Sequence, residues 1–174
     1  MEVNMGLKIG SQPLNIGGQA IEAVANTFAT SRVNLPLNTL ERQVFVVTDM
    51  LFDSETPDFV GLGGSRVLAQ VTKTEQTGML AINDPNVIGF QNQTIVSDGV
   101  GACCSFENTA PGHEYSTGNP KTDYITVIST PDFFVSVLGT ANVTTSSTSI
   151  RLRGFMAVAT ADVYAALVTE ELNA

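Results

Sequence analysis

The hydrophobic period of the chain changes once within residues 124–172, and this change limits the folds that the chain can adopt. Three segments rich in β-branched and aromatic residues come first, and each is bounded by Pro, Gly, Asn or Ser. They span residues 124–129, 133–139 and 150–158. After Val158, apolar residues recur at helical spacing, and Thr160 can cap a helix. These patterns predict antiparallel strands followed by a short terminal helix over 161–172 that lies on the sheet edge.

The third of these segments alternates with a period of two. Its two sets of side chains are Ile150, Leu152, Met156 and Val158, and between them Arg151, Arg153, Phe155 and Ala157. Successive side chains of a strand point to opposite faces of a sheet. We therefore expect one buried face, and one face that presents two arginines to water or to a partner.

The composition is typical of a packed β domain. The 174 residues are 43% hydrophobic, which is enough for one globular domain. Only 14% are charged, against about a quarter in typical proteins, and Thr, Ser, Asn and Gly take their place. Such a surface fits a Thr-rich β domain, and it fits equally a domain that is largely covered by other subunits.

The charge argues against nucleic acid as a direct partner. The net charge is −9, and the eight Lys and Arg residues form no basic run. Phosphate contacts need several clustered cations, so direct nucleic-acid binding is not expected. We also expect no signal peptide, because residues 1–10 lack a basic start and a continuous apolar core. No membrane-spanning segment is expected either, because no run of about 18 apolar residues exists.

The rest of the chain alternates between predicted strands and turns. Strands are predicted at 42–52, 65–73 and 100–107, a weaker one within 19–33, and short ones within 79–98 broken at 83–86 and 91–93. A long polar loop is predicted over 108–123. About eight strands with such turns predict an all-β fold, an antiparallel two-sheet sandwich of jelly-roll type. Gly and Pro within 1–18 predict an extended N-terminal arm, which leaves 19–174 for the sandwich domain and its helix.

The predicted strand at 42–52 is apolar on both faces. One set of side chains is Val44, Val46 and Met50, and the other is Phe45, Val47 and Leu51. An interior strand with this pattern is covered on both sides. We expect the second sheet on one side and a further element on the other.

No residue pattern predicts catalysis, and we expect no cofactor. His113 is the single histidine, and it could act in a hydrolase only with a Ser or Cys that folding brings near. No Gly-x-Ser-x-Gly sequence is present to prepare such a nucleophile. Cys103 and Cys104 are adjacent, so they point to opposite faces of a strand, and we expect two buried thiols.

An acidic cluster follows the strand at 42–52. Asp53, Glu55 and Asp58, with Asp49 before them, could hold Ca²⁺, because this cation prefers oxygen ligands. Their spacing does not match the twelve-residue helix-loop-helix site. A solvated acidic turn is the alternative interpretation.

The layout resembles the single-jelly-roll capsid proteins of tailless icosahedral viruses of bacteria and archaea. The features that carry the resemblance are the Gly-containing arm, about eight strands, few charges, and a closing strand that runs through Arg151 and Arg153 into a short helix. The resemblance implies a structural protein that self-assembles into a shell through the sides of the sandwich and through its arm. The implied partners are copies of itself and other virion proteins, in a virion made in the host cytoplasm.

One departure from these capsid proteins concerns the genome. Many small capsid proteins carry a basic arm that neutralises the packaged nucleic acid, and residues 1–18 are not basic. The resemblance then implies another protein, or an internal membrane layer, between this shell and the genome.

Two other classes remain open. A binding module, such as a lectin-like sandwich or a virion spike or fibre domain, would use the same fold and would show converging aromatic and carboxylate groups on a concave face. A hydrolase would place His113 in a cleft beside a hydrogen-bonded partner.

Overall fold

The computed structural model describes residues 6–10, 12–59, 61–100, 103–110 and 124–173. Ten strands account for most of them, and a helix of 13 residues follows the last strand. The strands are β1 (Leu7–Ile9), β2 (Leu14–Ile21), β3 (Ala29–Asn34), β4 (Gln43–Ser54), β5 (Leu62–Thr72), β6 (Val87–Asp98), β7 (Cys103–Ala110), β8 (Thr126–Ile128), β9 (Asp132–Thr140) and β10 (Ser147–Ala159). The helices are the 3-10 turn η1 (Thr39–Glu41) and α1 (Ala161–Asn173).

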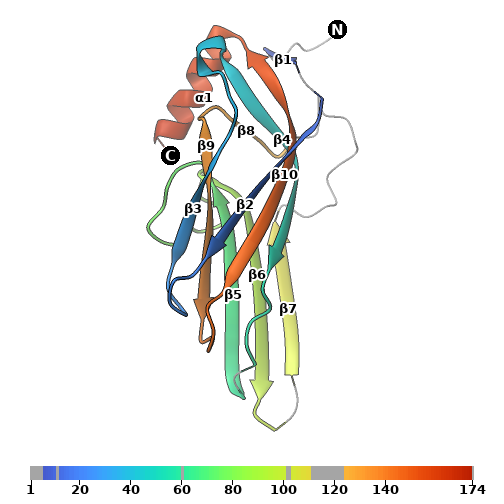
Figure 1. Ribbon diagram of the computed structural model, residues 1–174, viewed down its shortest axis with the longest axis vertical. Helices are drawn as coiled ribbons and strands as arrows, with labels where there is room; N and C mark the ends of the chain where they lie inside the picture. The colour runs from blue at the N-terminus through green and yellow to red at the C-terminus, as the bar shows by residue number, and fades with distance from the viewer. Residues whose placement is uncertain (1–5, 11, 60, 101–102, 111–123, 174) are drawn as a thin grey trace.

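The strands form two antiparallel sheets of five strands each (Figure 1). In the first, which we call the β10 sheet, β1 and β2 lie end to end along one edge of β10, and β4 and β8 follow on its other side. In the second, the β5 sheet, the order is β3-β9-β5-β6-β7.

The strand pairings nest inside one another. β2 pairs with β10, β3 with β9, β4 with β8, and β5 with β6. A long antiparallel ribbon that folds over into two facing sheets gives this order, and it is the jelly roll. The predicted fold class is confirmed. The two strands beyond about eight are β1, which continues the edge formed by β2, and β7, which extends the β5 sheet.

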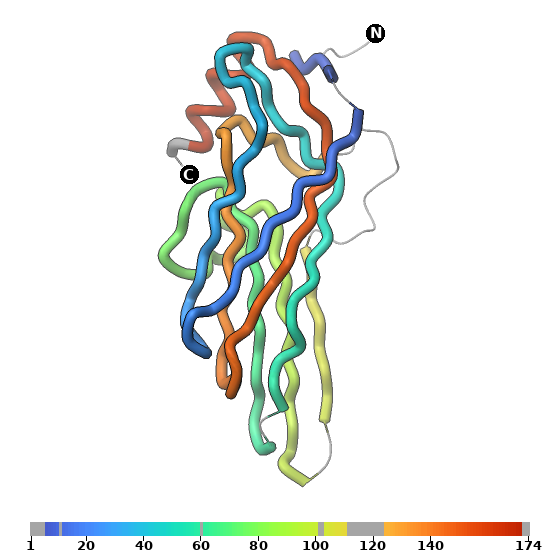
Figure 2. Tube along the Cα trace, viewed as in Figure 1, coloured from blue at the N-terminus to red at the C-terminus, as the bar shows by residue number. Residues whose placement is uncertain are grey.

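The N-terminal segment lies along its own β10 sheet (Figure 2). Strand β1 pairs with β10 from Ala157 to Ala159, and the N–H of Gly10 donates to the carbonyl of Met156 at 2.9 Å. Strand β2 pairs with β10 from Ser147 to Gly154. The segment predicted as an extended arm over 1–18 therefore contributes β1 and most of β2 to the edge of the sandwich, where the structure describes it.

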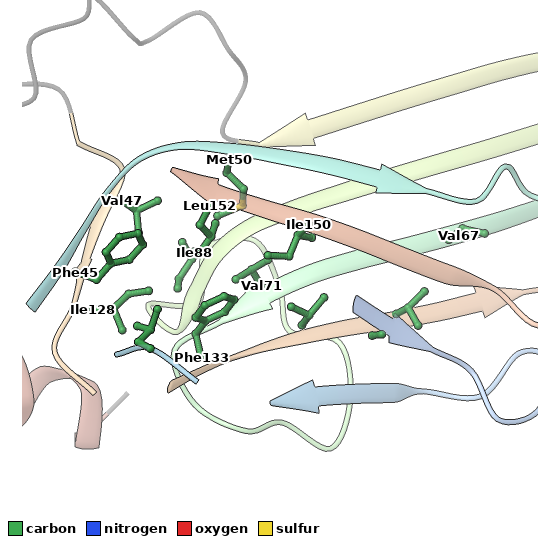
Figure 3. Close-up of a cluster of buried hydrophobic side chains, with 14 residues drawn as sticks. Phe45, Val47, Met50, Val67, Val71, Ile88, Ile128, Phe133, Ile150 and Leu152 are labelled. Carbon is green, nitrogen blue, oxygen red and sulfur yellow. The ribbon is translucent and has the colours of Figure 1, made fainter. Parts of the chain in front are cut away.

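The main core lies between the two sheets. Phe45 and Leu152 of the β10 sheet and Phe133 and Val71 of the β5 sheet are all fully buried, with 0% exposure (Figure 3). Each comes from a different strand of the sandwich, so the two sheets are joined by one continuous apolar cluster. Burial of this kind is the main stabilising term of a domain of this size.

Strand β4 is buried on both faces, as its apolar pattern predicted. Phe45 and Val47 point into the main core. Val44 and Val46 point the other way, into a second cluster with Ala157 and side chains of α1. Helix α1 is the further element that covers this outer face.

The position predicted for the terminal helix was wrong in one respect. Helix α1 lies over the outer face of the β10 sheet at one end, rather than on the sheet edge. Val163, Tyr164 and Leu167 pack there against the small side chains of Ala157 and Ala159. Because these alanines leave room above the sheet, an apolar helix face can approach it closely.

A buried carboxylate fixes the end of α1. Glu171 has 1% exposure, and its two oxygens accept from the N–H of Ser129 at 2.9 Å and from the Ser129 hydroxyl at 2.7 Å. Ser129 lies in the connection between β8 and β9. The last turn of the helix is thereby tied to both sheets.

A β-bulge at Thr48 changes which residues of β4 share a face. Val47 pairs with Gly154 and Asp49 pairs with Arg153, so that Thr48 is an extra residue in β4. The Thr48 hydroxyl donates to the carbonyl of Arg153 at 3.1 Å. The extra residue shifts the alternation by one position.

This shift overturns one part of the sequence interpretation. Met50 was grouped with Val44 and Val46, but it lies in the main core with Phe45. Leu51 lies on the outer face instead. A period-two pattern cannot show a bulge, because both faces of this strand are apolar.

Strand β6 was also predicted differently, as short strands broken at 91–93. It runs unbroken from Val87 to Asp98, and Gln91 within it has 3% exposure. The Gln91 side chain accepts from the Ser54 hydroxyl at 2.6 Å and donates to Glu107 at 2.8 Å. A buried amide with both groups paired is tolerated in a strand, so a turn-like sequence does not break it here.

Candidate functional site

The residues proposed for calcium are not brought together. Glu55 accepts from the N–H of Ser147 at 2.9 Å, and Asp53 is exposed at the end of β4. Asp58 points to a different connection, between β9 and β10. Within the described ranges no group of His, Cys, Asp and Glu side chains could hold a metal ion.

The two cysteines lie in a strand, as predicted, but they are exposed rather than buried. Strand β7 is the last strand of the β5 sheet, and its first six residues are exposed. The thiols are free, and adjacent positions place them on opposite faces. The prediction failed because the sequence does not reveal that this strand lies at the edge of the β5 sheet, where both of its faces are exposed over six residues. His113 lies outside the described residues.

A charged surface occupies the open half of the outer face of the β10 sheet. We call it the arginine face, and it consists of Asn15 on β2, Arg151 and Arg153 on β10, and Asp49, Leu51 and Asp53 on β4. Arg153 lies between Asn15 and Asp49, and Arg151 lies between Gly17 and Leu51. With Pro13, these side chains, Asp53 excepted, line an open hollow of about 320 Å³.

The arginines of this face form no ion pair with other described residues. In the parts of the chain that the structure describes, ion pairs join Arg32 to Asp132 and Lys73 to Glu170, and neither Arg151 nor Arg153 takes part in one. One oxygen of Asp49 accepts from the N–H of Met50 at 2.9 Å. The sequence predicted exposed arginines here, and the structure confirms their exposure.

A second surface is the end of the sandwich where four connections meet (Figure 1). These connections join β2 to β3, β4 to β5, β6 to β7, and β9 to β10. Each carries large apolar side chains in water. They are Val24 (63% exposed), Phe59 (59%), Leu62 at the start of β5 (79%), Val100 (90%) and Val143 (77%). We call this surface the apolar loop end.

Buried polar groups hold these connections in place. Glu22, with 3% exposure, accepts from the N–H groups of Gly139 at 2.7 Å and Ser146 at 2.8 Å. Asn142 exchanges hydrogen bonds with Asn26 through its main-chain N–H and carbonyl, at 2.8 and 2.9 Å. The connection after β2 is therefore joined to the connection after β9 by several bonds that water cannot easily reach.

Asp58 joins the third connection to this network. The N–H and the hydroxyl of Thr144 and the N–H of Val143 donate to one oxygen of Asp58, each at 2.8 Å. These bonds favour the ionised carboxylate, so they hold the pKa of Asp58 below its ordinary value. The N–H of Asp58 donates to the side chain of Asn142 at 3.0 Å.

Sequence reasoning missed two features of these surfaces. It did not place Asp49 and Asp53 beside the arginines, because strand neighbours are set by pairing over about a hundred residues of chain. It also assigned Val24 to the weak strand within 19–33 and Val100 to the strand at 100–107, whereas both lie in connections. An exposed valine in a connection and a buried valine in a strand look alike in the sequence.

No family model matches the chain, and no curated protein matches it. Among the described helices, none has the length and hydropathy needed to cross a membrane.

Proposed function

We propose that this protein is the subunit of a self-assembling shell, a single-jelly-roll virus coat protein. The observation that carries the proposal is the apolar loop end. Five large apolar side chains between 59% and 90% exposed lie in or beside connections at one end of the sandwich. Scattered apolar residues are normal on a surface, but a gathering of them at one place marks a contact with another protein.

The hydrogen-bond network beneath these side chains supports the proposal. Glu22, Asn142 and Asp58 tie three of the connections together, so their apolar tips are held before any partner arrives. A surface that is ordered in advance loses less conformational entropy on association. Such preorganisation suits a subunit that must form the same contact many times.

The composition of the surface supports the same interpretation. The chain has three lysines, and one of them, Lys73, is buried. Interface cores are depleted in Lys and Glu and tolerate Arg. Copies of itself are the partners proposed first, and other virion proteins would lie between this acidic shell and the genome.

The described part of the N-terminal segment bears on which surfaces would make the contacts between subunits. Because β1 and β2 are bound to β10 of the same chain, we place the principal contacts at the apolar loop end and the sides of the sandwich. The contribution of an arm to neighbouring subunits stays a prediction from the resemblance.

The test is the mass of the purified protein by analytical ultracentrifugation, with electron microscopy of the same samples. We expect large uniform particles or closed rings in the wild type. Val24→Lys combined with Val100→Lys should release subunits of 18.4 kDa, because a lysine in an interface core must lose its hydration. Leu40→Lys is the matched control, because Leu40 is 94% exposed but lies in η1, away from this end.

A wild-type protein that stays a monomer across salt and protein concentration would refute the proposal. Particles that persist in the Val24→Lys, Val100→Lys variant would show that the apolar loop end is not the contact that carries it.

A further inference from the structure

We propose that strand β7 pairs antiparallel with β7 of a second copy, so that two β5 sheets join into one continuous sheet and Phe106 of each copy lies against Phe106 of the other. The inference rests on the self-association proposed above and assigns one contact within it. Its basis is an open sheet edge whose sequence fits one register with itself.

Strand β7 has a free edge along all of its eight residues. It pairs one to one with β6, and no other described strand pairs with its free side (Figure 1). Its first six residues are exposed. Half of the N–H and C=O groups of such a strand point away from its sheet, so an extended strand is the occupant that can satisfy them all.

The edge lacks the features that commonly protect open edges. Proteins block such edges with Lys, Pro, a bulge or a very short strand, and β7 has none of these. Its one charged residue is Glu107, which is already bound within its own sheet. The Glu107 carboxylate accepts from Gln91 at 2.8 Å and from Thr109 at 3.2 Å. The backbone edge of β7 is therefore open to pairing.

The other sheet edges offer less to a partner. Strands β1 and β8 have three residues each, so they present few backbone groups. Strands β2 and β3 lie against each other on the opposite side of the sandwich. Arg32 on β3 is also bound to Asp132 of β9 at that edge. These differences single out β7 as the edge for strand addition.

The side chains of β7 select one register with a second copy. Opposite residues of an antiparallel pair lie on the same face, so both members of each pair have even numbers or both have odd numbers. The longest registers of this kind pair residues 103–109 or residues 104–110. The second sets Glu107 directly against Glu107, which is destabilising. The first sets Phe106 against Phe106 instead, and an aromatic pair is favourable.

The remaining pairs of this register are compatible. Glu107 lies opposite Ser105, whose hydroxyl can donate to the carboxylate. Cys104 lies opposite Asn108, and neither side chain is charged. Phe106 is 60% exposed in the single subunit, so the pairing also removes apolar surface from water.

A second copy is the occupant that this edge favours. Any extended segment could satisfy the backbone groups, but β7 itself also supplies the aromatic pair and places no like charges opposite each other. Isologous contacts of this kind are the commonest in homo-oligomers. The edge continues into the apolar loop end, because Val100 stands in the connection that leads into β7.

The contact would place neighbouring subunits more than hold them. One strand pair and one aromatic pair bury less than the roughly 1,200 Å² of a stable interface. Burial of the apolar loop end would supply most of the affinity, and subunits released from the shell would separate at this edge as well.

The test cross-links single-cysteine variants of the assembled protein. Cys103→Ser with Cys104→Ser removes the native thiols, and Phe106→Cys adds one beside the two-fold axis. Opposite Cα atoms of an antiparallel pair are about 4.5–5.5 Å apart, which suits a disulfide. Oxidised glutathione takes the two electrons and two protons of the thiols and leaves as two molecules of glutathione. Most subunits should then run as covalent dimers on a non-reducing gel.

Two further variants check the register with Phe106 in place. One keeps Cys104 alone through Cys103→Ser, and the other carries Asn108→Cys in the background without native thiols. Each variant alone sets its two thiols about 13 Å apart along the strands, so few dimers should form. Subunits of the two variants that are mixed and assembled together should form the disulfide between positions 104 and 108.

Charge at position 106 gives an independent measurement. In the mixture just described, Phe106→Lys in both partners should lower the yield of the disulfide by about tenfold or more, because like charges then lie opposite each other. Phe106→Lys in one partner and Phe106→Glu in the other should restore the yield. Leu40→Lys in both partners is the control and should change nothing, because Leu40 is exposed and lies in η1. Circular dichroism and thermal unfolding verify that each variant folds.

The outcomes separate this contact from the proposed function. A wild type that assembles, with no cross-link at position 106 and none in the mixture, overturns the contact and leaves the proposed function standing. Equal cross-linking at positions 104, 106 and 108 overturns the register and with it the contact. Cross-linking of position 106 to a different protein within purified particles overturns the second copy as the occupant. A wild type that forms no particles but cross-links at position 106 at high concentration supports the contact and refutes the shell.

Discussion

The outer face of the β10 sheet has two halves that lie on the same strands but differ in their cover. Val44, Val46, Ala157 and Ala159 form one half, and α1 packs on it. The arginine face forms the other half, and no element of the described chain lies over it. The difference shows that side-chain chemistry decides what covers a sheet. Small apolar side chains are sealed by the chain's own helix, whereas charged ones would be costly to bury without a matching partner.

The boundary between the halves should be the position where a substitution lowers the stability of the fold most. Gly154 lies opposite the bulge at Thr48, and a Cβ there would overlap the carbonyl oxygen of Val46 and lie 2.9 Å from the ring of Phe45. Gly154→Ala should therefore lower the free energy of unfolding by roughly 3 kcal/mol, as overpacking against backbone does. Denaturant unfolding measures it.

The matched control is Gly64→Ala in β5. A Cβ there has 3.4 Å to its nearest neighbour, the carbonyl oxygen of Ile95, so the contact is an ordinary one. Stability should stay within about 1 kcal/mol of the wild type. Equal losses in both variants would show that the close approach at Gly154 does not matter.

The second largest loss of stability should follow from removing Glu171, the residue that anchors α1 on the covered half. Glu171→Ala leaves the buried N–H and hydroxyl of Ser129 without their partner, at a cost of about 1–3 kcal/mol. Glu171→Gln keeps one acceptor oxygen and should lose less. Hydrogen exchange should show faster opening of α1 than of the core strands. Thr169→Ala, at an exposed position of the same helix, should have almost no effect.

The connection that follows β4 beyond the open half should make stability depend on pH. The folded pKa of Asp58 lies below its unfolded value, so its contribution is present above the unfolded pKa and is lost as the pH falls through the folded pKa. Unfolding measured from pH 6 downward should therefore show a smaller acid dependence in Asp58→Asn than in the wild type. Identical pH profiles would contradict the role given to Thr144 and Val143.

The open half should contribute least to the stability of the single subunit. Arg151 is exposed and forms no ion pair with the described residues, so Arg151→Ala should change the free energy of unfolding by no more than about 0.5 kcal/mol. The measurement belongs at low protein concentration, where association does not add to stability. A loss well above 1 kcal/mol would mean that Arg151 packs within its own subunit.

The covered half could be predicted from sequence to a large extent. The double-sided apolar pattern of β4 and the helical spacing after Val158 were both visible, so a strand covered on two sides and a terminal helix followed. Apolar burial leaves a periodic record in the sequence. The exact place of the helix did not follow, because Ala157 and Ala159 look like any small residues.

The buried polar groups of the structure produce no such periodic pattern in the sequence. Glu22 and Glu171 anchor two connections, but a single buried carboxylate with backbone partners has no local pattern. The acidic cluster at 53–58 suggested a calcium site instead, but Asp58 accepts from Val143 and Glu55 accepts from Ser147. The arginine face needed both a strand pairing and a bulge to form, and neither can be inferred from the alternation of β10 alone.

The bulge at Thr48 has a consequence for how this sequence can tolerate insertions and deletions. Its side chain is half-buried and many residues could stand there, so substitutions should be mild. Loss of Thr48 would remove the bulge and leave Val47 opposite Gly154 and Asp49 opposite Arg153, so Asp49 and Leu51 would stay on the outer face and Met50 in the core. A deletion at Thr48 should therefore be tolerated, whereas loss of any other residue of β4 would turn the side chains beyond it to the opposite face, and a homologue with such a loss would need a second change of length in the same strand.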